Sequence, residues 1–235
     1  MGGAMTPDAR SVPTPCVAPR ARPPASATVL VITCGALARE ILALIDLNGW
    51  SSARVACLPA ALHNRPERIP ERLRALIRVG KAKYRRIVVA YADCGSGGRI
   101  ARVAAEEGAL FLGGPHCYAL YAGAERFATL AAAELGTFYL TDYLARHFDT
   151  LVIRGLGLDR HPQLYAPLFG RYRRLLYLAQ TDDPALDSAA RRAAIRLRLR
   201  FERLDVGYGD LAPLLADALA PDTSDAVVDA AAVDA

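Results

Sequence analysis

The chain has 235 residues, and its composition of 53% hydrophobic and 23% charged residues is typical of a globular protein with a full core. Its longest apolar runs, at 28–34 and 87–92, are too short to span a bilayer, and we expect no signal peptide because no charged start followed by an apolar region is found. The formal net charge is +5, but Lys and Arg are not interleaved with aromatic residues, so we expect neither nucleic acid nor a membrane as a partner.

The five cysteines are an odd number and are widely spaced, whereas disulfide-stabilised secreted proteins are shorter and denser in cysteine. We therefore expect reduced thiols and a cytoplasmic location. Reduced thiols serve as core residues, as metal ligands or as nucleophiles.

Strands and helices are predicted between two tails. Residues 1–26 are rich in Pro, Ala and Arg, residues 221–235 are rich in Ala and Asp, and both are predicted to be disordered, which leaves 27–220 as a single domain. Apolar and β-branched runs predict strands at 28–33, 53–58, 86–92, 109–113, 150–154, 174–180 and, at an edge, near 197–201. Apolar spacing predicts helices at 36–47, 70–79, 117–135, 141–147 and 188–195, with one more that ends at 107.

This alternation predicts an α/β fold, with a Rossmann-like, mostly parallel sheet of about six to seven strands flanked by helices. In such a fold, ligands bind beyond the carboxyl ends of the strands. The residues that follow the predicted strands are therefore the candidates for a functional site.

Cysteine and histidine side chains gather at these positions. Cys34 follows the first strand, Cys94 follows the third, and His116 and Cys117 follow the fourth. Thiolates and imidazoles are preferred ligands of zinc, and thiolates also bind iron–sulfur clusters. These four residues therefore predict a metal site, with zinc favoured over an iron–sulfur cluster. The competing interpretation is that small thiols simply pack well beside glycine turns.

A glycine-rich turn surrounds Cys94. Gly95, Gly97 and Gly98 lead from a strand into a helix, where backbone N–H groups can bind an anionic cofactor, and Asp93 in the same turn is a candidate catalytic residue. The turn lacks the lysine of a P-loop and the spacing of a dinucleotide-binding motif, and a tight turn alone would explain the glycines. A position near a helix N-terminus would also lower the pKa of Cys94.

A second group of candidates follows the predicted strand at 150–154. Asp159 and His161 lie in a loop that begins with Gly155 and Gly157, and they are predicted to position the substrate or to act as acid and base. A helix cap and a solvated loop before Pro162 would explain the same residues equally well.

Several short motifs occur in a fixed order: TCG (33–35), LHNRP (62–66), DCG (93–95), HCY (116–118), GTFYLTD (136–142), HFD (147–149) and GLDRHP (157–162). Together they resemble the domain-of-unknown-function family 1638 over residues 27–215, although Ala119 stands where the family usually has an acidic residue. The resemblance implies a link to corrinoid-dependent methyl transfer in one-carbon metabolism. It also implies a corrinoid or a methyltransferase component as a partner.

Three functions remain open on these observations. The leading interpretation is a zinc–thiolate enzyme, a transferase or lyase that acts on a small anionic or thiol-bearing substrate. The second is a metal-free enzyme in which Cys94 is the nucleophile and His116 or His161 is the base. The third is a non-catalytic protein that binds a ligand or serves a methyl-transfer system as an accessory component.

Overall fold

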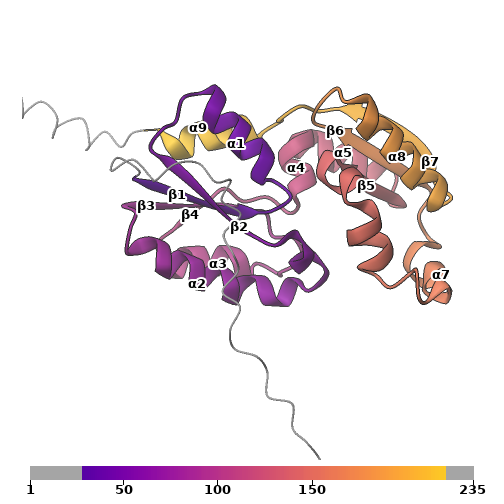
Figure 1. Ribbon diagram of the computed structural model, residues 1–235, viewed down its shortest axis with the longest axis horizontal. Helices are drawn as coiled ribbons and strands as arrows, with labels where there is room; N and C mark the ends of the chain where they lie inside the picture. The colour runs from indigo at the N-terminus through magenta and orange to yellow at the C-terminus, as the bar shows by residue number, and fades with distance from the viewer. Residues whose placement is uncertain (1–27, 221–235) are drawn as a thin grey trace, which may run out of the picture.

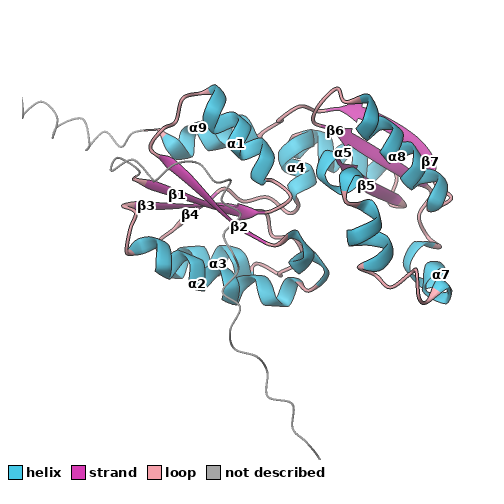
Figure 2. Ribbon diagram, viewed as in Figure 1, coloured by secondary structure: helices cyan, strands magenta, loops and turns pink. Residues whose placement is uncertain are grey.

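The computed structural model describes residues 28–220, so the predictions made for residues 1–26 and 221–235 lie outside the described residues (Figure 1). Within 28–220, seven strands form two parallel sheets, one of four strands in the order β2-β1-β3-β4 and one of three in the order β5-β6-β7. Helices cover both sheets (Figure 2). The α/β class is confirmed, but the strands divide between two sheets, so each sheet is smaller than expected.

The four-stranded sheet contains β1 (Val29–Cys34), β2 (Ala53–Leu58), β3 (Arg86–Ala90) and the short β4 (Leu110–Phe111). Helices pack on both of its faces. They are α1 (Ala38–Leu47) and α9 (Leu211–Leu219) on one face, and α2 (Ile69–Lys81) and α3 (Arg99–Glu106) on the other (Figure 1). Because both faces are covered, β1 is buried along its whole length and its sequence shows no polar alternation.

The three-stranded sheet contains β5 (Thr137–Thr141), β6 (Arg174–Ala179) and β7 (Arg200–Asp205). One face packs on α6 (Asp142–Arg146) and α8 (Pro184–Arg196) through Leu175 and Tyr177 of the central strand. The other face packs on α4 (Cys117–Ala122) and α5 (Ala124–Ala133) through Leu176 and Leu178. All six residues of β6 are therefore buried, as expected for a central strand.

Two segments differ from their predictions. Residues 150–154 lie in a π-helical turn (Asp149–Arg154), and Thr137–Thr141 forms a strand where none is predicted. Val152 and Ile153 of the π-helical turn are buried, so the apolar run correctly indicated a buried segment. A run this short, however, does not distinguish a buried strand from a buried helical turn.

The chain crosses between the two sheets twice. The first crossing runs through α4, which contributes Leu120 to the core of the four-stranded sheet and Ala122 to the packing on the three-stranded sheet. The positive φ of 83° at Gly123 then interrupts the helix predicted over 117–135 and separates α4 from α5. The second crossing follows β7 and leads into α9. The Asp210 carboxylate accepts a hydrogen bond of 3.0 Å from the backbone N–H of Ala124, so the two crossings are joined.

Short helical segments complete the connections. They are 3-10 turns at Ala60–Asn64, Pro66–Arg68 and Pro162–Leu164, and the helix α7 (Tyr165–Phe169). Within residues 28–220, none of the helices combines the length and the apolar character needed to cross a bilayer.

Candidate functional site

Three thiols from three strand ends meet at one cavity of about 90 Å³, which we call the thiol cavity. Cys34 is the last residue of β1, Cys94 follows β3, and Cys117 opens α4 after β4. Because these three strands are adjacent and parallel, their carboxyl ends lie at the same edge of the sheet. The structure therefore brings together all three of the cysteines that the sequence analysis singled out.

The three-stranded sheet supplies the remaining wall of the thiol cavity. Thr141 ends β5, Tyr143 and Leu144 belong to α6, and Leu151 lies in the π-helical turn. The carboxyl edges of both sheets thus face the same small space. A ligand in this cavity would contact both sheets.

The sulfur of Cys94 is held by hydrogen bonds. It accepts from the Cys117 thiol, from the backbone N–H of Cys117 and from the backbone N–H of Ala92. The hydrogen bond from the Cys117 thiol lowers the pKa of Cys94 most, and it outweighs the burial of the side chain, which acts in the opposite direction. The same hydrogen bond, together with burial, raises the pKa of Cys117. Cys94 is therefore the member of the pair that ionises first.

The turn around Cys94 is fixed by Asp93. The Asp93 carboxylate accepts hydrogen bonds from the backbone N–H groups of Gly97 at 3.1 Å and Gly98 at 2.7 Å, and from the Ser96 hydroxyl at 2.6 Å. These bonds, led by that of Ser96, lower the pKa of Asp93. The two glycine N–H groups thus have an acceptor within the chain. This favours the tight-turn interpretation of Gly95, Gly97 and Gly98 over an anionic cofactor site.

The backbone at Cys94 is strained. Its φ is +48°, in the left-handed region that residues other than glycine rarely adopt. Gly95, Gly97 and Gly98 follow with positive φ as well, which only glycine accepts without cost. The glycines therefore allow a sharp passage from β3 into α3 with Cys94 at its start.

Cys34 differs from Cys94 in its surroundings. Burial raises its pKa to about 11, although the Tyr91 hydroxyl and the backbone N–H of Ala36 both donate to its sulfur. Cys34 is thus a protonated thiol near neutral pH, while Cys94 in the same cavity has the lowered pKa.

His63 lines the thiol cavity, although it is not among the residues predicted to bind metal or to act in catalysis. His63 lies in the 3-10 turn Ala60–Asn64, at the exposed end of the cavity. The surrounding protein lowers its pKa by desolvation, and the nearby positive charge of His116 lowers it further. His116 itself is exposed, caps α4 and packs near Tyr118, without lining the cavity. The order of the elements could have predicted this position, because His63 follows β2 at the same edge of the sheet.

The three thiols of the predicted metal site line one cavity, but the predicted ligands are not arranged around a common metal position. Within the described part of the chain, no group of three or more His, Cys, Asp or Glu side chains is arranged to hold a metal ion. The three cysteines line a common space, whereas His116 stands outside it. Zinc binding by Cys34, Cys94, His116 and Cys117 stays a prediction.

Asp159 and His161 lie elsewhere. Both are exposed, and neither lines the thiol cavity. Their neighbours Leu158 and Pro162 instead line an open hollow of about 410 Å³ beside α7. Because residues 150–154 are π-helical, the loop after them does not start from a strand end, which is why it is absent from the sheet edge.

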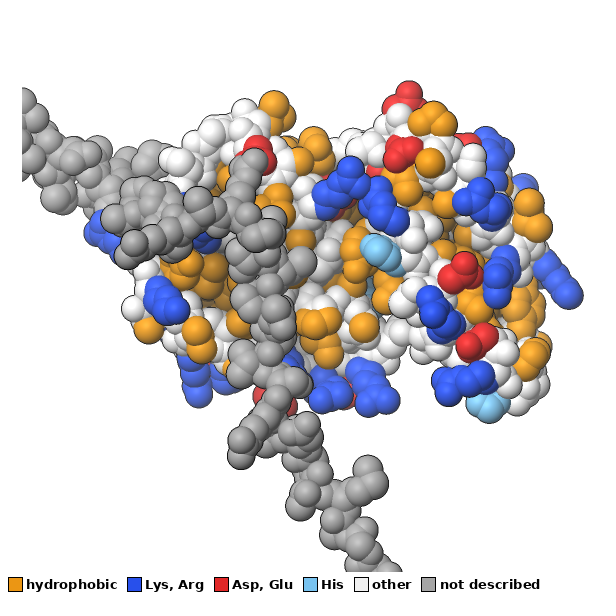
Figure 3. Space-filling model, viewed as in Figure 1, with side chains coloured by type: hydrophobic (Ala, Val, Ile, Leu, Met, Phe, Trp, Pro, Cys, Tyr) orange, Lys and Arg blue, Asp and Glu red, His pale blue; other side chains and the backbone are white. Residues whose placement is uncertain are grey.

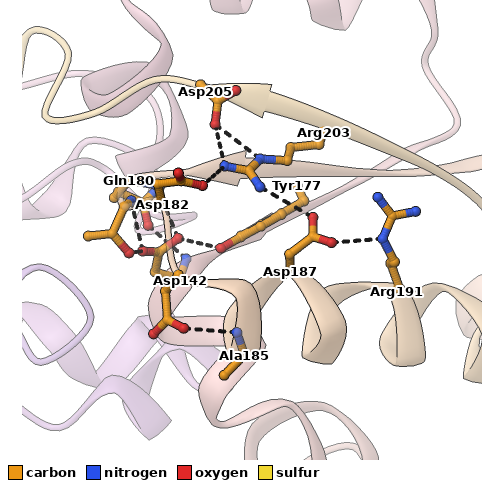
Figure 4. A network of polar contacts seen from close by, with 11 residues as sticks. Asp142, Tyr177, Gln180, Asp182, Ala185, Asp187, Arg191, Arg203 and Asp205 are labelled. Carbon is orange, nitrogen blue, oxygen red and sulfur yellow. Dashed lines mark hydrogen bonds and ion pairs between the residues drawn. The ribbon is translucent and has the colours of Figure 1, made fainter.

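A network of polar groups lies at the carboxyl edge of the three-stranded sheet (Figure 4). The buried Asp142 carboxylate accepts from the Tyr177 hydroxyl at 2.7 Å and from the N–H groups of Gln180 and Thr181, each at 3.0 Å. The Arg203 guanidinium contacts three carboxylates, those of Asp182, Asp187 and Asp205. Acidic and basic side chains are likewise interspersed on the outer surface around α7 and α8, at the right of Figure 3. Sequence reasoning missed this network because it placed no strand at 137–141.

A family model described as "Protein of unknown function (DUF1638)" matches residues 57–215. The matched segment contains Cys94, His116 and Cys117, and it begins after Cys34. Comparison with curated proteins finds no significant match, and comparison with solved structures finds none.

Proposed function

This chain belongs to the family of proteins of unknown function DUF1638, and we propose that it is an enzyme whose nucleophile is the Cys94 thiolate. The observation that carries this proposal is the set of three donors on the Cys94 sulfur: the Cys117 thiol, the Cys117 N–H and the Ala92 N–H. Donors of this kind stabilise the charged form of a sulfur atom, so they increase the thiolate fraction near neutral pH.

The backbone geometry of Cys94 supports the same role. Residues other than glycine with positive φ cost free energy and cluster at functional sites. A sharp strand-to-helix turn also presents the nucleophile in other enzymes. Here Asp93 holds such a turn by three hydrogen bonds, so the position of Cys94 is fixed by a rigid frame.

His63 is our candidate for the general base. Its lowered pKa leaves it neutral near pH 7, so it can accept the proton of the Cys94 thiol. The Cys94 sulfur then attacks an electrophilic carbon of the substrate, and the bond from that carbon to the leaving group breaks with its electron pair. Protonated His63 returns the proton to the leaving group.

The lining of the thiol cavity restricts the substrate. Leu37, Leu144 and Leu151 are apolar, and the volume is about 90 Å³, so the group that reaches Cys94 is small and uncharged. A negative charge elsewhere on the substrate would be favoured at the exposed end of the cavity, where His63 becomes positively charged once it has accepted the Cys94 proton. These features support transfer of an alkyl-type group from a small anionic substrate, and a methyl group is compatible with them.

Alkylation of the reduced, full-length protein with iodoacetamide tests this proposal. We expect Cys94 to react first, with a pH midpoint below that of an ordinary thiol, when each cysteine is followed by mass spectrometry. Cys57, which is buried in β2, is the internal control and should react slowly in the folded protein. Equal rates at Cys94 and Cys57 would show that Cys94 is not an activated nucleophile.

A zinc–thiolate centre is a second candidate, favoured by the presence of three soft ligands on one cavity. Elemental analysis of protein purified without oxygen separates the two candidates. About one zinc per chain, lost in both Cys34→Ser and Cys94→Ser, would support the zinc centre. Metal-free protein with fast alkylation at Cys94 would support the nucleophile.

A further inference from the structure

We propose that Cys94 and Cys117 form a reversible disulfide when a hydroperoxide enters the thiol cavity. The two side chains line the same small cavity, and the Cys117 thiol donates a hydrogen bond toward the Cys94 sulfur. Both residues line the cavity, so a reagent as small as hydrogen peroxide has access to them. This inference rests on the proposed function in one respect, namely that Cys94 is the reactive thiol.

The backbone holds the pair at short range. The N–H of Asp93 donates to the Gly114 carbonyl at 2.9 Å, and the N–H of Cys94 donates to the Pro115 carbonyl at 3.1 Å. Cys117 lies two residues beyond Pro115, and its own N–H donates to the Cys94 sulfur. A disulfide bond is about 2.05 Å long and its geometry is specific. With the backbone already paired, rotation of the two side chains is the movement we expect to bring the sulfurs to this distance.

The two thiols have unequal roles in the reaction. The Cys94 thiolate attacks one oxygen of hydrogen peroxide, the O–O bond breaks, and Cys94 becomes a sulfenic acid while hydroxide leaves and takes a proton to form water. The Cys117 thiol then attacks the Cys94 sulfur, the S–O bond breaks, and a second water leaves with the Cys117 proton. Two thiols and one peroxide thus give one disulfide and two waters.

Cys34 lines the same cavity, but its sulfur forms hydrogen bonds with other groups. Its sulfur accepts from the Tyr91 hydroxyl and from the backbone N–H of Ala36, and burial keeps it protonated. It therefore provides a matched control, because it is a third thiol in the same space without the contact that joins Cys94 to Cys117.

Oxidation would switch the site off. The disulfide contains no thiolate, so the nucleophile of the proposed reaction is absent until a dithiol reductant restores it. The reductant forms its own disulfide and returns one hydrogen to each cysteine.

The experiment treats reduced, full-length protein with hydrogen peroxide, blocks the remaining thiols with N-ethylmaleimide and maps the products by mass spectrometry. We expect a peptide that links Cys94 to Cys117 in the wild type and in Cys34→Ser, and we expect its loss after dithiothreitol. In Cys117→Ser, Cys94 should instead proceed to the sulfinic acid, because no thiol is in contact to capture the sulfenic acid. Circular dichroism establishes that each variant is folded.

Two results would overturn the inference: a wild-type product with Cys94 oxidised to the sulfinic acid, or a linkage of Cys94 to Cys34. Either result, with fast alkylation of Cys94 under reducing conditions, leaves the proposed function standing. Slow alkylation of Cys94 together with a Cys94–Cys117 linkage would instead remove the proposed function and the assigned order of attack by the two thiols, while the disulfide itself would stand.

Discussion

The carboxyl edges of the two sheets carry different chemistry, although the same topology produces both. At the four-stranded sheet, Cys94 accepts hydrogen bonds from Cys117 and Ala92 and also lines a cavity. At the three-stranded sheet, Asp142 accepts hydrogen bonds from Tyr177 and from its other partners and is 2% exposed. One edge therefore places an ionisable sulfur on the wall of a small cavity, while the other encloses a carboxylate.

This difference shows what a strand end does and does not provide. Parallel strands gather their following residues at one edge whatever those residues are. Reactivity then depends on whether the gathered group keeps an open side. A buried carboxylate with all its acceptor positions used holds the structure together, as Asp142 does between β5 and the end of β6.

We expect the largest effect on thiol reactivity from the substitution Cys94→Ser, at the carboxyl edge of the four-stranded sheet (the reactive edge). It should remove the fast phase of iodoacetamide labelling entirely, because burial still raises the pKa values of the remaining thiols Cys34 and Cys117. The free energy of unfolding should change by no more than about 2 kcal/mol, since the replacement is nearly isosteric. Labelling kinetics and urea unfolding measure both quantities. Cys34→Ser is the control, and a fast phase that survives in Cys94→Ser would break the distinction between the two edges.

The substitution Asp142→Ala tests the carboxyl edge of the three-stranded sheet, where the Asp142 carboxylate is enclosed. It should lower the free energy of unfolding by about 3 kcal/mol, because Tyr177, Gln180 and Thr181 lose an acceptor in the protein interior. Asp205→Ala is the matched control, because its carboxylate is 76% exposed and its contact with Arg203 contributes about 1 kcal/mol or less. Equal losses in urea unfolding would mean that enclosure does not distinguish these carboxylates.

The substitution Cys117→Ala tests how much the Cys117 thiol contributes to the reactivity of Cys94. Loss of the thiol donor should raise the pKa of Cys94, so the midpoint of its alkylation moves to higher pH and its rate near pH 7 falls. The pH dependence of the alkylation rate measures the shift, with Cys57→Ala as a control outside the cavity. An unchanged midpoint would show that the backbone N–H groups alone activate Cys94.

The smallest effect concerns Glu107, a carboxylate held by cations and not, like Asp142, by neutral donors. Hydrogen bonds from Arg78, then Arg74, lower its pKa from 4.5 to about 2, and Lys81 adds to them. Because the folded-state pKa is the lower one, its stabilisation is present above pH 4.5 and is lost as the pH falls toward 2. Melting temperatures of wild type and Glu107→Gln should therefore converge with acid. A constant difference would contradict this.

Much of the fold could be predicted from apolar runs. The strand over 53–58 has the predicted bounds, and the parallel arrangement follows from the alternation of strands and helices. The division into two sheets could not be predicted, because local sequence patterns do not specify which strands pair. The error at 150–154 has the same origin, since Val152 and Ile153 are apolar and buried in either conformation.

The candidate site was predictable where a residue lies at the end of a correctly assigned strand or in the turn that follows it. Cys34, Cys94 and Cys117 meet that condition, and the structure places them together. The hydrogen bonds that set Cys94 apart from Cys34 depend on atomic positions, so the sequence could not rank the thiols. Asp159 and His161 were assigned to the same edge only because a strand was predicted before them.

The position of α9 in the chain determines the order in which the two sheets can complete their cores during synthesis. Leu211 and Leu215 are fully buried in the core of the four-stranded sheet, yet the ribosome makes them after every residue of the three-stranded sheet. The nascent chain therefore exposes an incomplete apolar surface until α9 emerges, and such surfaces attract chaperones. The core of the sheet that carries Cys94 is therefore completed only after the whole of the three-stranded sheet has been synthesised.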